Sequence, residues 1–159
     1  MKYNAYTRQE ELEAALTHGF GLLLSIIAVY ILFSTMPLAT DPLLKAGCGI
    51  YASTLILVYA ISTLSHMYTF QSINTLLRRC DQGFIYLLIV GTATPFMSLL
   101  LSSARSHIVT TGIYISILLW SLAFIGCISK IAFAHRINNV VMSLYILLGW
   151  GEAMTLMFV

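Results

Sequence analysis

The chain has 159 residues, of which only eight Lys+Arg and six Asp+Glu carry charge, whereas 59% are hydrophobic. Soluble domains have roughly 25% charged residues, so the composition excludes a soluble globular protein and an intrinsically disordered one. The net charge of +2 comes from scattered basic residues, and we expect no nucleic-acid partner. The composition therefore indicates a membrane protein.

Long uncharged stretches recur along the whole chain and predict membrane-spanning helices. A bilayer core of ~30 Å requires about 20 helical residues at 1.5 Å each. These stretches lack the two-residue alternation of a membrane β-barrel. The predicted spans are residues 17–36, 46–67, 82–101, 109–128 and 138–158. We therefore expect an all-α, polytopic transmembrane bundle that forms one membrane domain over residues 1–159.

The basic residues are distributed unequally between the two ends of the predicted helices. One side carries Lys2, Arg8, Arg78, Arg79, Lys130 and Arg136. The other side carries only Lys45 and Arg105. The positive-inside rule then predicts a cytoplasmic N-terminus in a multi-pass protein of the plasma (inner) membrane.

Ionisable residues from three predicted helices share the cytoplasmic leaflet. His18 begins the first span, His66 ends the second, and Asp81 immediately precedes the third. Ionisable groups in a membrane are costly, which makes them candidates for a functional site, although helix ends can also present such residues to lipid headgroups. Ser62 lies one helical turn before His66, so the two side chains share a helix face.

Other assignments remain open for the acidic residues. Asp81 could pair with Arg78 or Arg79, or interact with the helix dipole, without any role in chemistry. Glu11 precedes His18 by two helical turns and could share its face if the first helix begins early, or it could be a solvated helix cap. Glu152 interrupts the last apolar stretch, and its role is open.

Four ordered motifs together identify a family resemblance: EELEAALTHGFG, STLSH, RRCDQGFIYLLIVGTATPF and LYILLGW. With them the chain resembles the bacterial hemolysin III family, within the progestin and adiponectin receptor superfamily. The resemblance implies a seven-helix fold with a cytoplasmic N-terminus, of which this chain carries five spans. Glu11 and His18 match the family's Glu-x-x-Asn-x-x-x-His motif, in which Ala14 replaces the Asn.

The resemblance also implies a zinc ion near the cytoplasmic face. It assigns His66 as a zinc ligand, with Ser62 and Asp81 around the metal and its water as the catalytic residues; His18 is the poorer candidate ligand. The superfamily's other two ligands form a His-x-x-x-His pair on the seventh helix, which is absent here. Since catalytic zinc usually has three protein ligands, we expect weak zinc binding and little or no enzymatic activity in this chain.

Three functions are compatible with these features. The resemblance implies zinc-dependent hydrolysis of a lipid amide, with an incomplete metal site in this chain. The family's name implies instead a cytolytic protein that perturbs or forms pores in membranes. A third interpretation is a nonfunctional remnant of a longer protein. Membrane lipids are the expected partners, and a second copy or a second chain could supply the missing helices.

Overall fold

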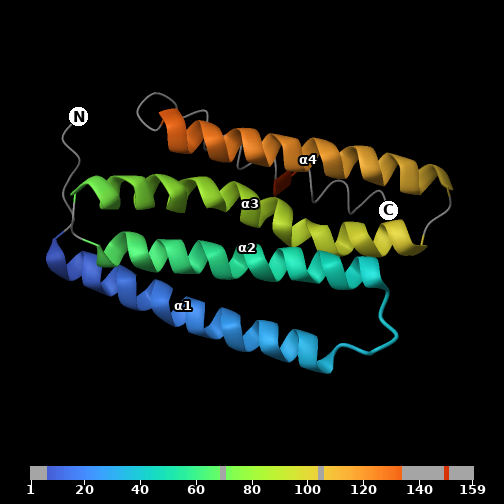
Figure 1. Ribbon diagram of the computed structural model, residues 1–159, viewed down its shortest axis with the longest axis horizontal. Coiled ribbons are helices and arrows are strands. Elements are labelled where there is room, and N and C mark those ends of the chain that lie inside the picture. Colours follow the sequence, from blue (N-terminus) through green and yellow to red (C-terminus); the bar gives the residue numbers. More distant parts are fainter. Residues whose placement is uncertain (1–6, 69–70, 104–105, 134–148, 151–159) are drawn as a thin grey trace.

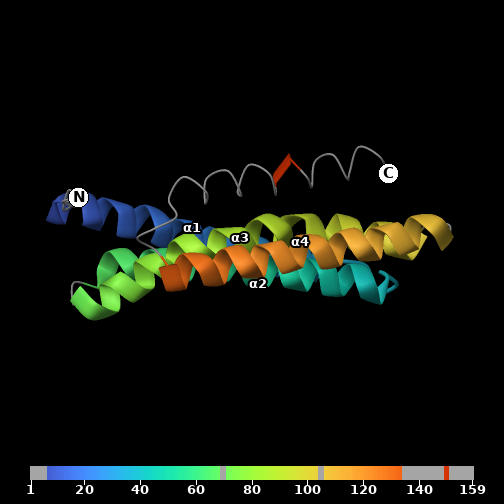
Figure 2. The same ribbon diagram turned by 90° about the horizontal axis from the view of Figure 1, so that it is seen from above.

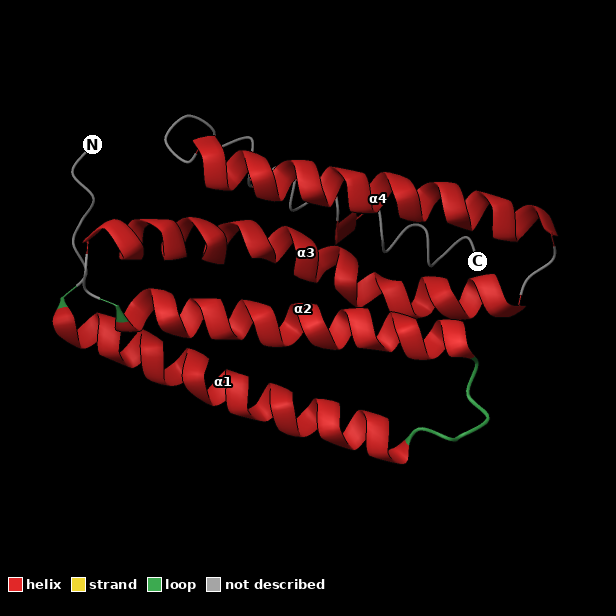
Figure 3. Ribbon diagram, viewed as in Figure 1, coloured by secondary structure: helices red, strands yellow, loops and turns green. Residues whose placement is uncertain are grey.

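The computed structural model describes residues 7–68, 71–103, 106–133 and 149–150, and the first three of these ranges contain four long helices (Figure 1). The helices are α1 (Arg8–Thr35), α2 (Pro42–Met67), α3 (Gln71–Ser103) and α4 (Ser106–Phe133). Each is long and apolar enough to cross a membrane. The described part of the chain contains no strand, as Figure 3 shows. It is thus an all-helical membrane protein.

The helices follow one another in a row, each antiparallel to its chain neighbour. In the described residues α1 packs on α2, α2 on α3 and α3 on α4. Figure 1 shows the row from its broad side, and the helices overlap when it is viewed at right angles in Figure 2. The starts of α1 and α3 and the ends of α2 and α4 therefore lie at one end of the row, here called the polar end.

Local sequence determines where the first two helices begin. Thr7 caps α1 in a capping box, because its hydroxyl accepts from the Glu10 N–H and its own N–H donates to the Glu10 carboxylate. Asp41 caps α2 by accepting from the Leu43 N–H at 2.7 Å, and Pro42 occupies the first helical position, where its missing N–H costs no hydrogen bond.

Helices α1 and α3 begin earlier than the hydropathy pattern predicts. The expected spans begin at residues 17 and 82, whereas the helices begin at Arg8 and Gln71. Hydropathy locates the part of a helix that lies in hydrocarbon, and a capped helix can continue beyond it into the interface. The fifth predicted span, residues 138–158, lies outside the described residues except for the helical residues 149–150.

Glycines allow α2 and α3 to approach closely. A methyl group at Gly91 would overlap with Thr54, and one at Gly47 would overlap with Ser98. Small residues at such positions are typical of helix contacts in membranes. Both contacts have the same antiparallel register, which places Asp81 level with Leu64, midway between Ser62 and His66 along α2.

Helices α3 and α4 share the largest apolar cluster of the described residues. Its buried members are Tyr86, Val90, Met97, Leu119, Ala123 and Cys127. Pro95 lies within α3, where it removes a backbone hydrogen bond, and the helix bends in this region in Figure 1.

Candidate functional site

Glu11 links three helices at the polar end of the row. Its Oε2 lies 2.8 Å from Nδ1 of His66 on α2, and its Oε1 accepts a hydrogen bond from Nη2 of Arg78 on α3. The side chains of Glu11, His66 and Arg78 are 22%, 16% and 31% exposed, so all three are largely withdrawn from the surface. Ion pairs in such surroundings are stronger than those on an open surface.

The local structure of α1 explains why Glu11 takes this position. Glu10 is engaged in the capping box, and Glu13 accepts from the Gln9 amide at 2.9 Å on the same helix. Glu11 lies on the helix face that packs against α2, together with His18 two turns later. Because α1 begins at Arg8, the helix is already formed at Glu11.

His18 completes this cluster by stacking on His66. The two imidazole rings are nearly parallel, at an interplanar angle of 9°, and their centroids are 5.4 Å apart. His18 also contacts the ring of Tyr59, with the two ring centroids 6.4 Å apart. His66 is thus held by a carboxylate at Nδ1 and by a ring against its face. We call Glu11, His18, His66 and Arg78 the histidine cluster.

Asn74 connects the histidine cluster to the end of α2. Its Oδ1 accepts from Nε of Arg78 at 2.6 Å, and its Nδ2 donates to the carbonyl oxygen of Tyr68. Tyr68 is the residue that caps α2, where its N–H donates to the Leu64 carbonyl oxygen. The Arg78 guanidinium is therefore oriented by Glu11 of α1 and Asn74 of α3, and Asn74 is held in turn by the residue that follows α2.

The two residues predicted to be catalytic are placed relative to His66 by their positions along α2 and α3. Ser62 is 4% exposed and one turn before His66 on α2. Asp81 is half-buried and lies level with this turn, but ten residues after the start of α3 rather than at its N-terminus. The hydrogen-bond partner of His66 is Glu11, and the described residues show no hydrogen bond between His66 and Asp81.

The residues of the histidine cluster do not by themselves form a metal site. Within the described residues, no group of three or more His, Cys, Asp and Glu side chains is arranged to hold a metal ion. A zinc enzyme usually uses three protein ligands. The Glu11 contact to Nδ1 of His66 is nevertheless the contact that a metal-binding imidazole commonly makes through its other nitrogen. The described residues thus supply one imidazole with a carboxylate at its Nδ1, which is fewer donors than a zinc enzyme uses.

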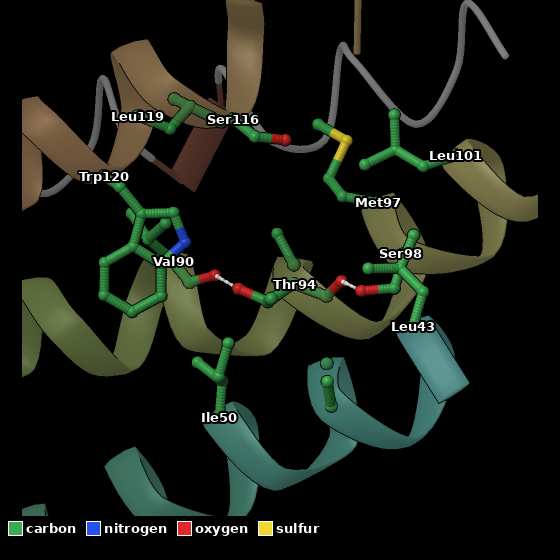
Figure 4. A pocket seen from close by; sticks show the side chains of 13 residues that line it. Leu43, Ile50, Val90, Thr94, Met97, Ser98, Leu101, Ser116, Leu119 and Trp120 are labelled. Carbon is green, nitrogen blue, oxygen red and sulfur yellow. Dashed lines mark hydrogen bonds between the residues drawn. The ribbon is translucent and has the colours of Figure 1, made fainter. Parts of the chain in front are cut away.

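A cavity in the other half of the row differs in character from the histidine cluster. It has a volume of about 190 Å³ and lies between α2, α3 and α4 (Figure 4). No ionisable side chain lines it, and the hydroxyls of Thr94, Ser98 and Ser116 donate to carbonyls of their own helices. Among the described residues, the lining of this cavity thus offers no ionisable group for acid-base chemistry.

Sequence reasoning did not identify Glu11 and Arg78 as site residues. Arg78 appeared there in the charge distribution and as a possible partner for Asp81, and Glu11 as a possible solvated cap and as a match to the family motif, without a site role. The available signal was the spacing of Glu11 and His18, which shows a common helix face once α1 begins at Arg8. Glu152 lies outside the described residues.

Comparison with known proteins identifies one matching family and similar proteins from two Bacillus species. The family described as Haemolysin-III related matches residues 6–158. The Hemolysin-3 homolog of Bacillus subtilis (strain 168) is 34% identical over 145 residues, which cover 91% of this chain and 65% of that protein. Hemolysin-3 of Bacillus cereus is 34% identical over 142 residues, which cover 89% of this chain and 62% of that protein.

These matches cover nearly all of the present chain, which spans less than two thirds of the length of these two relatives. No solved structure matches significantly. The resemblance drawn from the four sequence motifs is thus confirmed by the family match and by both relatives. The chain belongs to the haemolysin-III related family.

Proposed function

We propose that the histidine cluster is part of the site for the chemistry that the superfamily resemblance implies, zinc-dependent hydrolysis of a lipid amide. The observation that carries this proposal is the 2.8 Å contact between Glu11 Oε2 and His66 Nδ1. In metal sites, a carboxylate at one imidazole nitrogen orients the ring so that the other nitrogen faces the metal. Ser62, one turn before His66 on α2, and Asp81, level with the turn of α2 between Ser62 and His66, are the proposed catalytic residues.

The proposal includes an orientation in the membrane. Arg8, Arg78, Arg79 and Lys130 all lie toward the polar end of the row, whereas Lys45 lies near the start of α2 at the other end. By the positive-inside rule the polar end is cytoplasmic and the protein is placed in the plasma (inner) membrane. The histidine cluster then faces the cytoplasmic leaflet, where lipid headgroups are available as substrates.

The number of protein ligands determines how strongly we expect the chain to bind zinc. His66 is one imidazole, and the resemblance implies that a His-x-x-x-His pair supplies the other two ligands. Each missing ligand weakens binding, because water must replace it. We therefore propose that the 159-residue chain binds zinc weakly and has no appreciable amidase activity, and that two further helices carrying the pair restore both.

Zinc content after dialysis tests this proposal. The purified 159-residue protein, a version extended by the two helices, and the extended version with His66→Ala are dialysed and analysed by plasma mass spectrometry. We expect zinc to remain stoichiometric only in the extended protein with His66 intact. Stoichiometric zinc in the 159-residue protein that disappears on His66→Ala would contradict the ligand count and indicate a ligand from elsewhere, such as His18 or a neighbouring subunit.

The names of the relatives favour a second candidate function. Both are named hemolysin-3, which refers to lysis of red cells. A membrane-perturbing activity would depend on the apolar helices rather than on the histidine cluster. Release of haemoglobin from red cells by the purified protein, equal for the wild type and for His66→Ala, would support this function over the hydrolytic one.

A further inference from the structure

The position of the hydrogen between Glu11 and His66 follows from the two partners of Glu11. One carboxylate oxygen accepts from the Arg78 guanidinium and the other faces Nδ1 of His66. A guanidinium remains charged in proteins and favours the ionised form of a carboxylate beside it. An ionised carboxylate can only accept, so the hydrogen between Glu11 and His66 resides on Nδ1.

We propose that Glu11 is a positioning residue that keeps the proton of the uncharged His66 ring on Nδ1, so that this tautomer leaves the lone pair of Nε2 available to a ligand. This inference rests on the proposed function only for what the ligand is. The tautomer itself follows from the contacts at Glu11 and is measurable without a metal.

Three further contacts make the arrangement specific to this glutamate. Arg78 is fixed by the Asn74 side chain, which is itself bonded to Tyr68 at the end of α2. The His18 ring stacks on His66 and limits rotation of that imidazole. Neither Glu10 nor Glu13 can substitute for Glu11, since both are bonded to residues at the start of α1.

The tautomer is tested by nitrogen NMR of the full chain labelled with ¹⁵N-histidine, in detergent micelles at alkaline pH, where free imidazole is neutral. The sequence has four histidines, and loss of a signal pair in His66→Gln assigns the residue. Three proteins are compared: the wild type, Glu11→Ala and Glu13→Ala. Glu13→Ala is the matched control, because it removes an acid of the same helix turn that has no contact with His66.

In the wild type and in Glu13→Ala we expect the His66 signals of a protonated Nδ1 and an unprotonated Nε2. In Glu11→Ala we expect loss of the Nδ1–H form and appearance of the Nε2–H form. A wild-type His66 protonated at Nε2, or a spectrum unchanged by Glu11→Ala, would overturn the proposal. The wild-type spectrum alone decides the first point if Glu11→Ala does not fold.

The proposed zinc site and the proposed role of Glu11 can be rejected independently of each other. The tautomer experiment contains no zinc, and the dialysis experiment does not detect the tautomer. A His66 protonated at Nδ1 in a protein whose extended form binds no zinc would retain the positioning role of Glu11 and reject the metal site. Zinc bound through His66 without the Nδ1–H tautomer would reject the role of Glu11 alone.

Discussion

Arg78 on α3 and Glu11 on α1 form an ion pair across the end of α2, the helix that lies between them. In the described part of the chain, α1 packs along α2 and not along α3. The ion pair therefore links α1 directly to α3, two helices that do not pack on each other, and the Glu11 contact to His66 adds α2 to this link. It also places a carboxylate in a largely apolar protein together with the cation that stabilises it.

Replacement of Arg78 by Ala should destabilise the protein by about 1 kcal/mol or more, because a partly buried carboxylate loses a charged hydrogen-bond donor. Arg79→Ala is the matched control, since it removes the same charge from the next residue, which is not bonded to Glu11. Denaturation midpoints in detergent measure both effects. Equal denaturation midpoints for the two variants would show that the ion pair does not stabilise the protein.

Close packing of α2 and α3 leads to a second prediction. A methyl group at Gly91 would overlap with the Thr54 hydroxyl, whereas nothing lies within 4 Å of one at Gly49. We expect Gly91→Ala to lower the free energy of unfolding by about 1–3 kcal/mol through overpacking. Gly49→Ala should be neutral or stabilising, because Ala favours helix over Gly.

Restoring space should reverse the Gly91 effect. The new methyl group would meet three side-chain atoms of Thr54, and Thr54→Ala removes two of them, Oγ1 and Cγ2, while Cβ remains at 3.1 Å. The double variant should therefore recover part of the stability that Gly91→Ala loses. A Gly91→Ala protein as stable as Gly49→Ala would contradict the tight α2–α3 contact seen in the structure.

Membrane orientation is testable with introduced cysteines in a background without Cys48, Cys80 and Cys127. Thr75→Cys lies near the start of α3 at the polar end, and Leu38→Cys lies in the α1–α2 connection, where the leucine is 98% exposed. A membrane-impermeant maleimide added to intact cells should label Leu38→Cys and leave Thr75→Cys unlabelled. The reverse pattern would place the histidine cluster on the outer side.

The sequence predicted the fold class because the membrane imposes it. Long uncharged stretches must form helices in hydrocarbon, and the first four stretches lie largely within α1 to α4. The helix starts were less predictable, since Thr7 and Gln71 lie in polar sequence where caps and local hydrogen bonds decide. That difference moved Asp81 from the expected helix N-terminus to the third turn of α3.

The site was predictable only in part for a related reason. His18, His66 and Ser62 were identified because polar residues in apolar spans are conspicuous. Glu11 and Arg78 lie in charged segments, where a functional residue resembles any solvated one. Their pairing depends on how α1, α2 and α3 meet at the polar end. The two residues are 67 positions apart in the sequence, so no local sequence pattern predicts their contact.

Substitutions of Ser62 and of its neighbour Ser65 distinguish a functional role of Ser62 from a structural one. Its side chain is 4% exposed, and the described residues provide its hydroxyl with no hydrogen bond, whereas Ser65 is fully buried and donates to the Ser62 carbonyl oxygen at 2.9 Å. A buried hydroxyl without a partner is costly. Ser62→Ala should therefore leave the denaturation midpoint unchanged or raise it, while Ser65→Ala should lower the stability by about 0.5–1 kcal/mol.

The two serines should have the opposite ranking in function. If Ser62 acts beside His66, Ser62→Ala in the extended, zinc-containing protein should abolish lipid-amide hydrolysis while zinc content stays stoichiometric. Ser65→Ala should retain hydrolysis at temperatures where it is folded, because its hydroxyl is engaged within α2. A Ser62→Ala protein that is less stable than Ser65→Ala, with hydrolysis intact, would assign Ser62 to packing, and the catalytic role would then have to be carried by Asp81 without it.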